Sequence, residues 1–345
     1  MSWTGGTVAY DWAVMEITEG GNPVWTIRPA NSSEWDTTWS ECPYATYFHS
    51  REWGEAWQRY VPRRIRCIPQ RVEFADGRSA ILTLTTQRTN RGLTETVVAS
   101  PGGTYGGWIS ADELASDQIA ILTRSLLQIP TLVWRVNPFG PVVDVGETYR
   151  SEEFTQAVML NRPIVEIQRG WSKGHRSAAN QAERSGVLVR EAASPADWDA
   201  YFQIYRAASH RWGKRKVDYG QPLFKALFEN GSGNRELLLA EAEGRVIAGA
   251  LILYASRHAV YWHGAARAEF FPFRPVHLLI RESMRRAQSR GCEWFDFNPS
   301  SGLEGVQAFK RGFGTTELAA PLITRRAGLA HLLARISRVA TIRRR

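Results

Sequence analysis

Cysteine, long apolar runs and a secretion signal are what this sequence lacks. Its three cysteines, Cys42, Cys67 and Cys292, are far apart and odd in number, which argues against a disulfide framework or a cysteine zinc site and fits a reducing cytoplasm. The longest apolar run, Val246–Ala255, is far shorter than the ~20 residues of a membrane-spanning helix. The first residues have no basic start followed by an apolar stretch, so we expect no signal peptide.

Negative charge is missing from the end of the chain. Residues 325–345 hold seven arginines and no Asp or Glu, and they account for all but two of the nine net positive charges. The rest of the chain is therefore close to neutral. One helical face of this tail is apolar and is formed by Leu329, Leu332, Leu333, Ile336 and Ala340. The tail predicts a basic amphipathic helix that binds an anionic membrane surface, contacts RNA phosphates or docks on its own domain.

Apolar residues are abundant in the rest of the sequence. Of the 345 residues, 43% are hydrophobic and 22% are charged, so the chain can bury a large core and wholesale disorder is excluded. The length suggests about two domains. We interpret the fourteen tryptophans mainly as buried aromatic packing, with a dedicated ligand-stacking role as the alternative.

Strand and helix signals alternate along the chain. The first 45 residues suggest short strands and loops, and we expect helices to begin at Ser50 and Ser110. In the first half we expect strands at 64–74, 79–86, 93–100, 131–136 and 154–160. In the second half we expect helices at 172–185, from Ser194 onward, and at 222–229, 276–289 and 303–310. The strands expected between them are 187–191, 236–242, 246–254, 259–266, 293–297 and 316–323. This mixture favours an α/β or α+β fold with helices packed on sheets.

Five short motifs follow one another along the chain. They are an aromatic stretch leading into a Ser-x-x-Trp helix, a Tyr-Gly-Gly loop, a basic helix followed by Gly-Val, a strand with a central Asp, and a Phe-Lys-x-Gly-Phe-Gly motif. Their positions are Ala45–Trp53, Pro101–Gly107, Trp171–Val187, Cys292–Phe297 and Phe309–Gly314. Each motif alone is weak, but their common order over residues 45–320 is specific, and together they resemble the FemAB-like family of the GNAT acyltransferase superfamily.

The resemblance implies an α/β (α+β) fold with two GNAT-like domains, each a mixed central sheet flanked by helices. We expect a degenerate N-terminal GNAT-like domain at 1–165, a GNAT-like acyltransferase domain at 166–324 and the basic amphipathic helix at 325–345. The family reading places both substrates in the cleft between the two domains.

The sequence departs from the superfamily at two points. The pyrophosphate-binding signature R/Q-x-x-G-x-G/A is absent, and Arg267–Pro275 stands where it is expected. This departure argues against acyl-CoA as the donor. It does not argue against the fold assignment, because FemAB-like proteins commonly lack the signature. The long coiled-coil insertion of some peptidoglycan-modifying members is also missing, since the sequence contains no heptad run.

The chemistry that the resemblance implies is attack of an amine on an activated acyl carbon. This reaction needs a deprotonated amine, a donor to the tetrahedral oxyanion and groups that orient both substrates. It requires no Cys or Ser nucleophile, in agreement with the lack of a Gly-x-Ser-x-Gly motif. The seven histidines show no ligand-type spacing, so we expect no metal site.

Lys310 is the first candidate for a catalytic residue, and Asp296 is the second. Lys310 lies within Phe309–Gly314, where a cation can stabilise the oxyanion or bind a substrate carboxylate or phosphate; a solvated lysine on a short helix is the alternative. Asp296 lies on the aromatic strand Trp294–Phe297, where an apolar setting would let it orient an amine or act as a base. Its alternative role is to cap the turn at Asn298–Ser301.

Tyr261 and His263 complete the catalytic candidates. They alternate with Trp262 on a strand, so we expect them to point to the same face. His263 could then deprotonate the amine, and a structural histidine is the alternative.

Two further groups are candidates for binding. Arg267, Arg274 and His277 bracket the start of the central helix, where they would grip a CoA phosphate or the terminal phosphates of a tRNA, unless they are solvated loop residues. Candidates for substrate binding are Tyr105, Gly106 and Trp108 of the glycine-rich loop and Lys173 and Arg176 of the basic helix. For these the alternatives are plain turn glycines and a solvated helix face.

These observations predict an N-acyltransferase whose acceptor is an amine of a metabolite, an amino sugar or a cell-envelope precursor. The first hypothesis for the donor is acyl-CoA or another acyl thioester, and the second is aminoacyl-tRNA. The third hypothesis is a non-catalytic module that binds membrane or nucleic acid. We expect no tightly bound cofactor, a cytoplasmic location, and possible contact of residues 325–345 with the inner face of the membrane.

Overall fold

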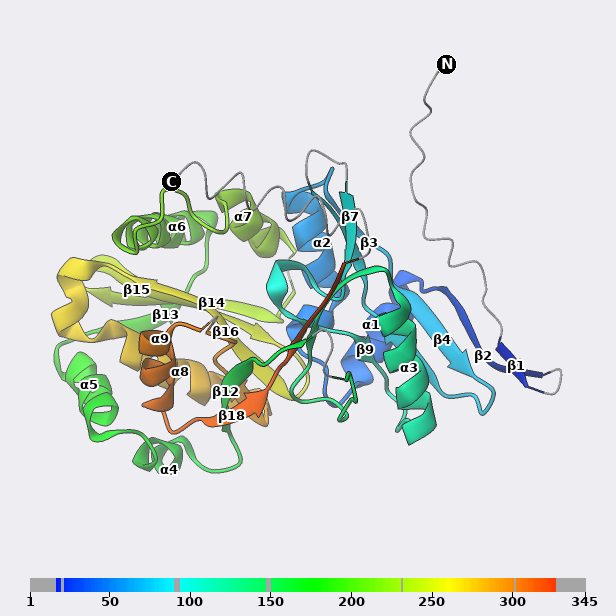
Figure 1. Ribbon diagram of the computed structural model, residues 1–345. Coiled ribbons are helices and arrows are strands. Elements are labelled where there is room, and N and C mark those ends of the chain that lie inside the picture. Colours follow the sequence, from blue (N-terminus) through cyan, green and yellow to red (C-terminus); the bar gives the residue numbers. More distant parts are fainter. Residues whose placement is uncertain are drawn as a thin grey trace, which may run out of the picture.

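The computed structural model describes residues 17–19, 22–89, 94–146, 150–230, 232–300 and 302–326, and it forms two lobes (Figure 1). The predicted amphipathic helix lies outside the described residues except for its first two positions. No helix in the described part of the chain is long and apolar enough to cross a membrane.

The first lobe contains two sheets and three helices. One sheet has the strand order β1 (Ile17–Glu19), β2 (Asn22–Pro29), β4 (Gln70–Phe74), β5 (Ser79–Leu82) and β9 (Trp108–Ile109). The other has the order β11 (Arg150–Ser151), β19 (Leu322–Arg326), β10 (Thr131–Val136), β7 (Thr94–Val98), β6 (Thr85–Thr89) and β3 (Ile65–Cys67), and β8 (Tyr105–Gly106) pairs with β10. The helices are α1 (Ser32–Glu41), α2 (Arg51–Tyr60) and α3 (Ser116–Gln128).

Helix α1 differs from the strands and loops expected for the first 45 residues. The sequence Asn31-Ser32-Ser33 is typical of a turn, but in the structure Asn31 is part of a capping box that starts the helix. The side chain of Asn31 accepts a hydrogen bond from the backbone N–H of Glu34, whose carboxylate accepts one from the N–H of Asn31. This reciprocal pair satisfies two helix-terminal donors and starts a helix there.

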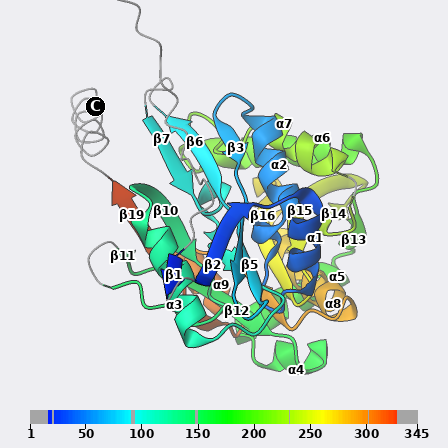
Figure 2. The same cartoon turned by 90° about the vertical axis from the view of Figure 1, so that its right-hand side faces the viewer.

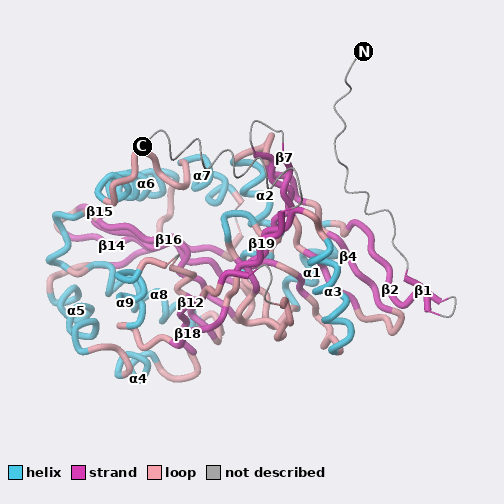
Figure 3. The backbone as a smooth tube through the Cα atoms, viewed as in Figure 1, coloured by secondary structure: helices cyan, strands magenta, loops and turns pink. Residues whose placement is uncertain are grey.

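The second lobe is a single sheet between two layers of helices (Figure 3). Its strand order is β13 (Leu188–Glu191), β14 (Arg235–Ala242), β15 (Arg245–Tyr254), β16 (His258–Ala266), β17 (Trp294–Asp296), β12 (Phe154–Met159) and β18 (Thr316–Ala319). One face is covered by α6 (Pro195–Arg211) and α7 (Gln221–Glu229). The other is covered by α4 (Ile164–Arg169), α5 (Lys173–Arg184), α8 (Pro275–Ser289) and α9 (Glu304–Arg311). Helix α8 connects β16 to β17, and these two strands are parallel.

The lobes exchange strands. The sequence predicts one strand over 316–323. In the structure this strand is interrupted at Ala320–Pro321, because proline has no N–H and restricts the backbone of the residue before it. Its first half, β18, pairs with β12 in the second lobe. Its second half, β19, pairs with β10 in the first lobe, and Figure 2 shows these two strands side by side. Strand β12 precedes residue 165 yet lies in the sheet of the second lobe. The domain boundaries at 165 and 324 stay predictions, and β12 before the first boundary and β19 at the second each belong to the sheet of the other lobe.

A shared aromatic core holds the lobes together. Trp53 of α2 packs edge-on against Trp262 of β16 with their ring centroids 5.2 Å apart. Tyr47 and Phe48 of the first lobe belong to the same cluster of buried residues as Tyr201 of α6. The orientation of the lobes is therefore fixed by buried apolar contact, which is worth ~25 cal/mol per Å² of apolar surface removed from water.

Candidate active site

The site begins where two parallel strands part. Strands β16 and β17 pair only from His258 to Val260 on one side and from Trp294 to Asp296 on the other. Beyond that point the N–H of Phe297 donates to Gln156 of β12, so the far half of β16 has no partner on this edge. A pocket of about 560 Å³ occupies the opening. It is lined by Arg211, Trp212, Tyr261, Gly264, Ala265, Ala266, Phe271, Arg274, Pro275, Val276, His277, Phe297, Val306, Phe309 and Lys310.

The pocket is mostly apolar, and Lys310 is the most deeply buried of the basic side chains that line it. Its side chain reaches the pocket from the last turn of α9 and is 7% exposed. Its ammonium group donates a hydrogen bond of 2.5 Å to the backbone carbonyl of Asn298. Burial lowers the pKa of Lys310 to about 8, and the negative charge of Asp296 raises it in part. An ammonium has three donors, so two remain for a ligand.

Asp296 is fully buried behind the pocket wall. Its Oδ1 accepts hydrogen bonds from the Thr155 hydroxyl at 2.5 Å and the Asn298 N–H at 3.0 Å, and its Oδ2 accepts one from the Tyr105 hydroxyl at 2.8 Å. Burial raises the pKa of Asp296 above its usual range, although these hydrogen bonds act in the opposite direction. With both oxygens occupied and no exposed surface, Asp296 has the geometry of a residue that positions others.

Tyr261 and His263 do not share a face, which corrects the alternation that we expected. A β-bulge in β16 places Leu251 opposite His263 and Ile252 opposite Tyr261, so Trp262 is the extra residue and the alternation shifts by one. Tyr261 lines the pocket. His263 lies on the opposite face, with its Nδ1 2.5 Å from the Tyr201 hydroxyl, and burial lowers its pKa to about 3. His263 thus has the surroundings of a neutral core histidine.

The Tyr261 side chain is held at the pocket wall by a glycine. A Cβ atom on Gly264 would lie 1.7 Å from the Tyr261 hydroxyl oxygen, so only glycine leaves room for this side chain. In the part of the chain that the structure describes, the hydroxyl has no hydrogen-bond partner. It is therefore available to a ligand at the same pocket as Lys310.

The three residues predicted to bind phosphate at the start of α8 separate in the structure, and burial lowers the pKa of His277 to about 4, so this histidine is not a cation at neutral pH. Arg274 and His277 line the pocket, and Nδ1 of His277 is buried with no hydrogen-bond partner among the described residues. Arg267 does not line it; its guanidinium donates to the Val246 carbonyl at 3.1 Å and lies 3.9 Å from the carboxylate of Glu269.

The backbone before α8 does not form an anion cradle. Pro272 and Pro275 have no N–H, and the N–H groups of Arg267, Phe270, Arg274 and His277 all donate to backbone carbonyls. A 3₁₀ helix, Ala268–Phe273, fills the segment. Bound phosphates at helix N-termini depend on free amides, and six of the eleven positions from Arg267 to His277 offer none, because two are prolines and four already donate.

The predicted substrate-binding residues lie outside the pocket. Tyr105 is fully buried and reaches Asp296 across the two lobes. A Cβ atom on Gly106 would lie 2.4 Å from the Ala99 backbone, and Trp108 packs on Trp134. The glycine-rich loop thus allows close packing of the protein on itself. Lys173 and Arg176 are exposed on α5.

Sequence reasoning missed three contributors. Arg211 and Trp212, at the end of α6, and Phe271 form the rim of the pocket, and the Arg211 guanidinium lies 5.0 Å from the centre of the Phe271 ring. Trp212 and Phe271 are 51% and 44% exposed, which is unusual for large aromatic side chains. No sequence pattern identifies this rim, because it joins the ends of two elements that are about 60 residues apart.

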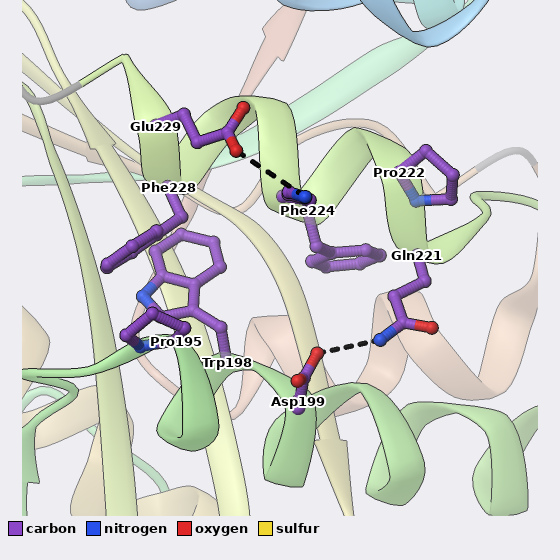
Figure 4. Close-up of a pocket in the computed structure, with 9 residues that line it drawn as sticks. Pro195, Trp198, Asp199, Gln221, Pro222, Phe224, Phe228 and Glu229 are labelled. Atoms are coloured by element: carbon purple, nitrogen blue, oxygen red, sulfur yellow. Dashed lines mark hydrogen bonds and ion pairs between the residues drawn. The ribbon is translucent and has the colours of Figure 1, made fainter.

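A second hollow of about 640 Å³ lies between α6 and α7 (Figure 4). Its polar side chains are already paired: Gln221 donates to Asp199 at 2.7 Å, and Lys225 lies 3.7 Å from Glu229. None of the predicted site residues lines it. The described residues contain no cluster of three or more His, Cys, Asp or Glu side chains that could hold a metal ion. The pocket at Lys310, which four of the predicted site residues line, is therefore the candidate active site.

Comparison with known proteins finds a family match over part of the chain. Residues 171–311 match the acetyltransferase (GNAT) domain family. A lipid II:glycine glycyltransferase of Staphylococcus haemolyticus is 29% identical over 109 residues, which are 30% of this chain and 26% of that protein. Its counterpart in Staphylococcus epidermidis is 34% identical over 87 residues, which are 23% and 21% of the two chains. The chain thus matches only about a quarter of the length of these relatives.

Solved structures share the fold over most of the chain. The crystal structure of FemX has a TM-score of 0.66 at 15% identity and covers 86% of this chain and 96% of its own. The structure of L-PGS from Bacillus licheniformis has a TM-score of 0.55 at 13% identity and covers 90% and 97%. At these identities the likeness concerns the fold alone, and it extends over both lobes.

Proposed function

Because the chain contains a GNAT domain and has the double-GNAT fold of the FemAB-like proteins, we propose that it is an aminoacyltransferase. It would move an aminoacyl group from aminoacyl-tRNA to a primary amine of a cell-envelope precursor. The observation that carries the proposal is that a buried lysine lines the same pocket, in the opening between β16 and β17, as a tyrosine whose hydroxyl has no hydrogen-bond partner among the described residues.

Two observations favour aminoacyl-tRNA over acyl-CoA, which the sequence analysis ranks first. The relatives with significant similarity are named as glycyltransferases that act on lipid II. In addition, two prolines and four N–H groups that already donate to carbonyls leave fewer than half of the positions from Arg267 to His277 for the backbone cradle that the pyrophosphate of CoA requires. An aminoacyl ester needs no such cradle at this position.

The pocket offers the groups that acyl transfer needs. When the acceptor nitrogen attacks the ester carbon, a C–N bond forms and negative charge develops on the carbonyl oxygen. The Lys310 ammonium and the Tyr261 hydroxyl would donate to this oxygen. The ester C–O bond then breaks, the ribose oxygen takes up a proton, and the acceptor nitrogen loses one. Arg211 and Arg274 lie at the pocket, where they would contact phosphates.

Asp296 would support the reaction from behind the pocket wall, by positioning other residues. It holds Tyr105 of the first lobe, Thr155 of β12 and the turn at Asn298 to one carboxylate. The same Asn298 supplies the carbonyl that binds Lys310. The carboxylate therefore fixes the turn against which the lysine is placed and favours the charged form of the lysine.

The first test is a donor screen with the purified protein and an amine acceptor such as a peptidoglycan-precursor peptide. We expect turnover with tRNA charged with a labelled amino acid and none with acetyl-CoA, and we expect millimolar CoA to leave Tm unchanged. Turnover with acetyl-CoA, or a CoA-dependent rise in Tm, would instead support an acyl thioester as donor. If no donor is used while charged tRNA or anionic vesicles still bind, the chain is a binding module.

The predicted tail gives a second arm of the same screen. Because β19 extends to Arg326, the deletion should remove residues 327–345 only. If the tail contacts tRNA, the deletion weakens binding and reduces its salt dependence. If it holds the protein at the inner face of the membrane, the deletion abolishes binding to anionic vesicles and leaves tRNA binding intact.

The pH dependence of transfer should follow the ionisation of the Lys310 ammonium group. Since burial lowers the pKa of this side chain to about 8, the catalytic ammonium is present below pH 8 and is lost above it. We therefore expect kcat to fall on the alkaline side with an apparent pKa near 8, and Lys310→Arg to shift this limb upward by more than 2 units because a guanidinium keeps its proton. The measurement is kcat from pH 6 to 10 for both proteins. An unchanged alkaline limb in the arginine variant would assign the pKa to another group.

A further inference from the structure

The start of α5 is bound to the end of α9 through a histidine. Nε2 of His175 lies 3.0 Å from the backbone carbonyl of Phe309, and its Nδ1 lies 3.0 Å from the Ser172 hydroxyl. The Phe309 carbonyl belongs to the last turn of α9, where it also accepts a hydrogen bond of 3.2 Å from the N–H of Gly312. The residue after Phe309 is Lys310. The histidine therefore anchors the backbone immediately before the catalytic candidate.

The glycines of the Phe-Lys-x-Gly-Phe-Gly motif permit this contact. A Cβ atom on Gly312 would lie 2.4 Å from the His175 ring, and one on Gly314 would lie 2.9 Å from the carbonyl oxygen of Gly170. Gly314 also has a φ of +69°, a left-handed conformation that glycine adopts without strain. In addition, the Ser172 N–H donates to the Gly312 carbonyl at 2.8 Å. Two segments that are 140 residues apart in the sequence are thus in backbone contact.

Helix α9 depends on such an anchor. It has eight residues, and its N-cap, Leu303, makes no side-chain capping hydrogen bond. A helix this short is not stable by itself in water. Its apolar contact to the lobe includes Phe309, whose ring lies 5.2 Å from His175 and 5.4 Å from His277. His175 is therefore one of the polar contacts, and part of the packing, that hold the C-terminal end of α9.

We propose that His175 is a positioning residue that, through the Phe309 carbonyl and the close approach at Gly312, holds Lys310 in the pocket. The proposal rests on the proposed function only in that Lys310 is taken as the group that serves the reaction. The placement of Lys310 is a separate question, and it can be measured without turnover.

The test compares the full-length wild-type protein with His175→Ala, His175→Gln and a control, Arg184→Ala. The glutamine amide nitrogen can take the place of Nε2 as donor to the Phe309 carbonyl. Arg184 is exposed at the far end of the same helix. Two quantities are measured: the kinetics of transfer, and the pH dependence of Lys310 acetylation by acetic anhydride, followed by mass spectrometry of the peptide that contains it.

We expect His175→Ala to lower kcat about 10- to 100-fold with KM changed less than about twofold, since a displacement of about 1 Å has effects of this size. The acetylation midpoint of Lys310 should rise from about 8 toward the ordinary 10.5, because a loosened α9 exposes the amine to water. His175→Gln should restore most of both values, and Arg184→Ala should leave both unchanged.

A double-mutant cycle checks the route through Gly312. Gly312→Ala alone should move the acetylation midpoint in the same direction as His175→Ala, because the added methyl group displaces the ring. Together the two changes should be clearly less than additive, as expected for residues in direct contact.

The outcomes separate this proposal from the proposed function. If Lys310→Met retains full turnover while His175→Ala still shifts the acetylation midpoint, the catalytic assignment is wrong and the positioning role stands. If His175→Ala leaves both kcat and the midpoint at wild-type values while Lys310→Met is inactive, the positioning role is wrong. Loss of kcat in His175→Ala without any shift of the midpoint, or without recovery in His175→Gln, would also overturn it.

Discussion

Replacing Lys310 with methionine is expected to reduce kcat for aminoacyl transfer by about 10²–10³-fold, the effect of losing one preorganised oxyanion donor. Methionine is about as long as lysine and apolar, so it should fill the same space beside Phe297 and Phe309. Because burial already disfavours the charged lysine, its removal should not lower the free energy of unfolding. We therefore expect KM and Tm to stay near their wild-type values.

The measurement is single-turnover transfer of a labelled amino acid at saturating donor, with circular dichroism and Tm to verify the fold. Lys173→Met is the matched control, because Lys173 is an exposed lysine outside the pocket. It tests at the same time the binding role predicted for that residue, since a substrate contact there would raise KM and leave kcat unchanged. Wild-type kcat in the Lys310→Met protein would refute the role of Lys310.

Replacing Asp296 with alanine is expected to lower the free energy of unfolding by about 3–5 kcal/mol. The change removes one acceptor from the Tyr105 hydroxyl, the Thr155 hydroxyl and the Asn298 N–H, and each buried donor left without a partner costs ~1–3 kcal/mol. The substitution also removes the cost of holding a carboxylate away from water. The net decrease in the free energy of unfolding is therefore smaller than the sum over the three donors. Urea denaturation at pH 7 measures the effect.

Asp199→Ala serves as the control for this prediction. Asp199 is exposed and bonded to Gln221 on the outside of α6, so its loss should change stability by less than about 0.5 kcal/mol. Tyr105→Phe and Thr155→Val each remove a single donor to Asp296 and should cost ~1.5–3 kcal/mol, the range for hydrogen bonds to charged groups. An Asp296→Ala protein as stable as wild type would show that the three donors find other partners.

The sequence predicted the elements of the second lobe well. The Ser194-Pro195 signal placed the start of α6 correctly, and the runs that became β14 to β16 are nearly continuous in apolar residues. These signals are local, because each depends on neighbouring residues and on what their side chains can bury. The ordered motifs also predicted the GNAT-type fold, which the family match confirms.

The site was only partly predictable for a physical reason. The sequence alone determined that Lys310 lies in a glycine-rich motif and that Asp296 lies on an aromatic strand. Only the tertiary structure decided that Trp262 bulges and sends His263 to the far face, and that Pro321 divides one predicted strand between two sheets. It also decided that His175 meets Gly312. Register shifts and contacts between distant segments depend on how whole elements pack, and that information is spread over the entire chain.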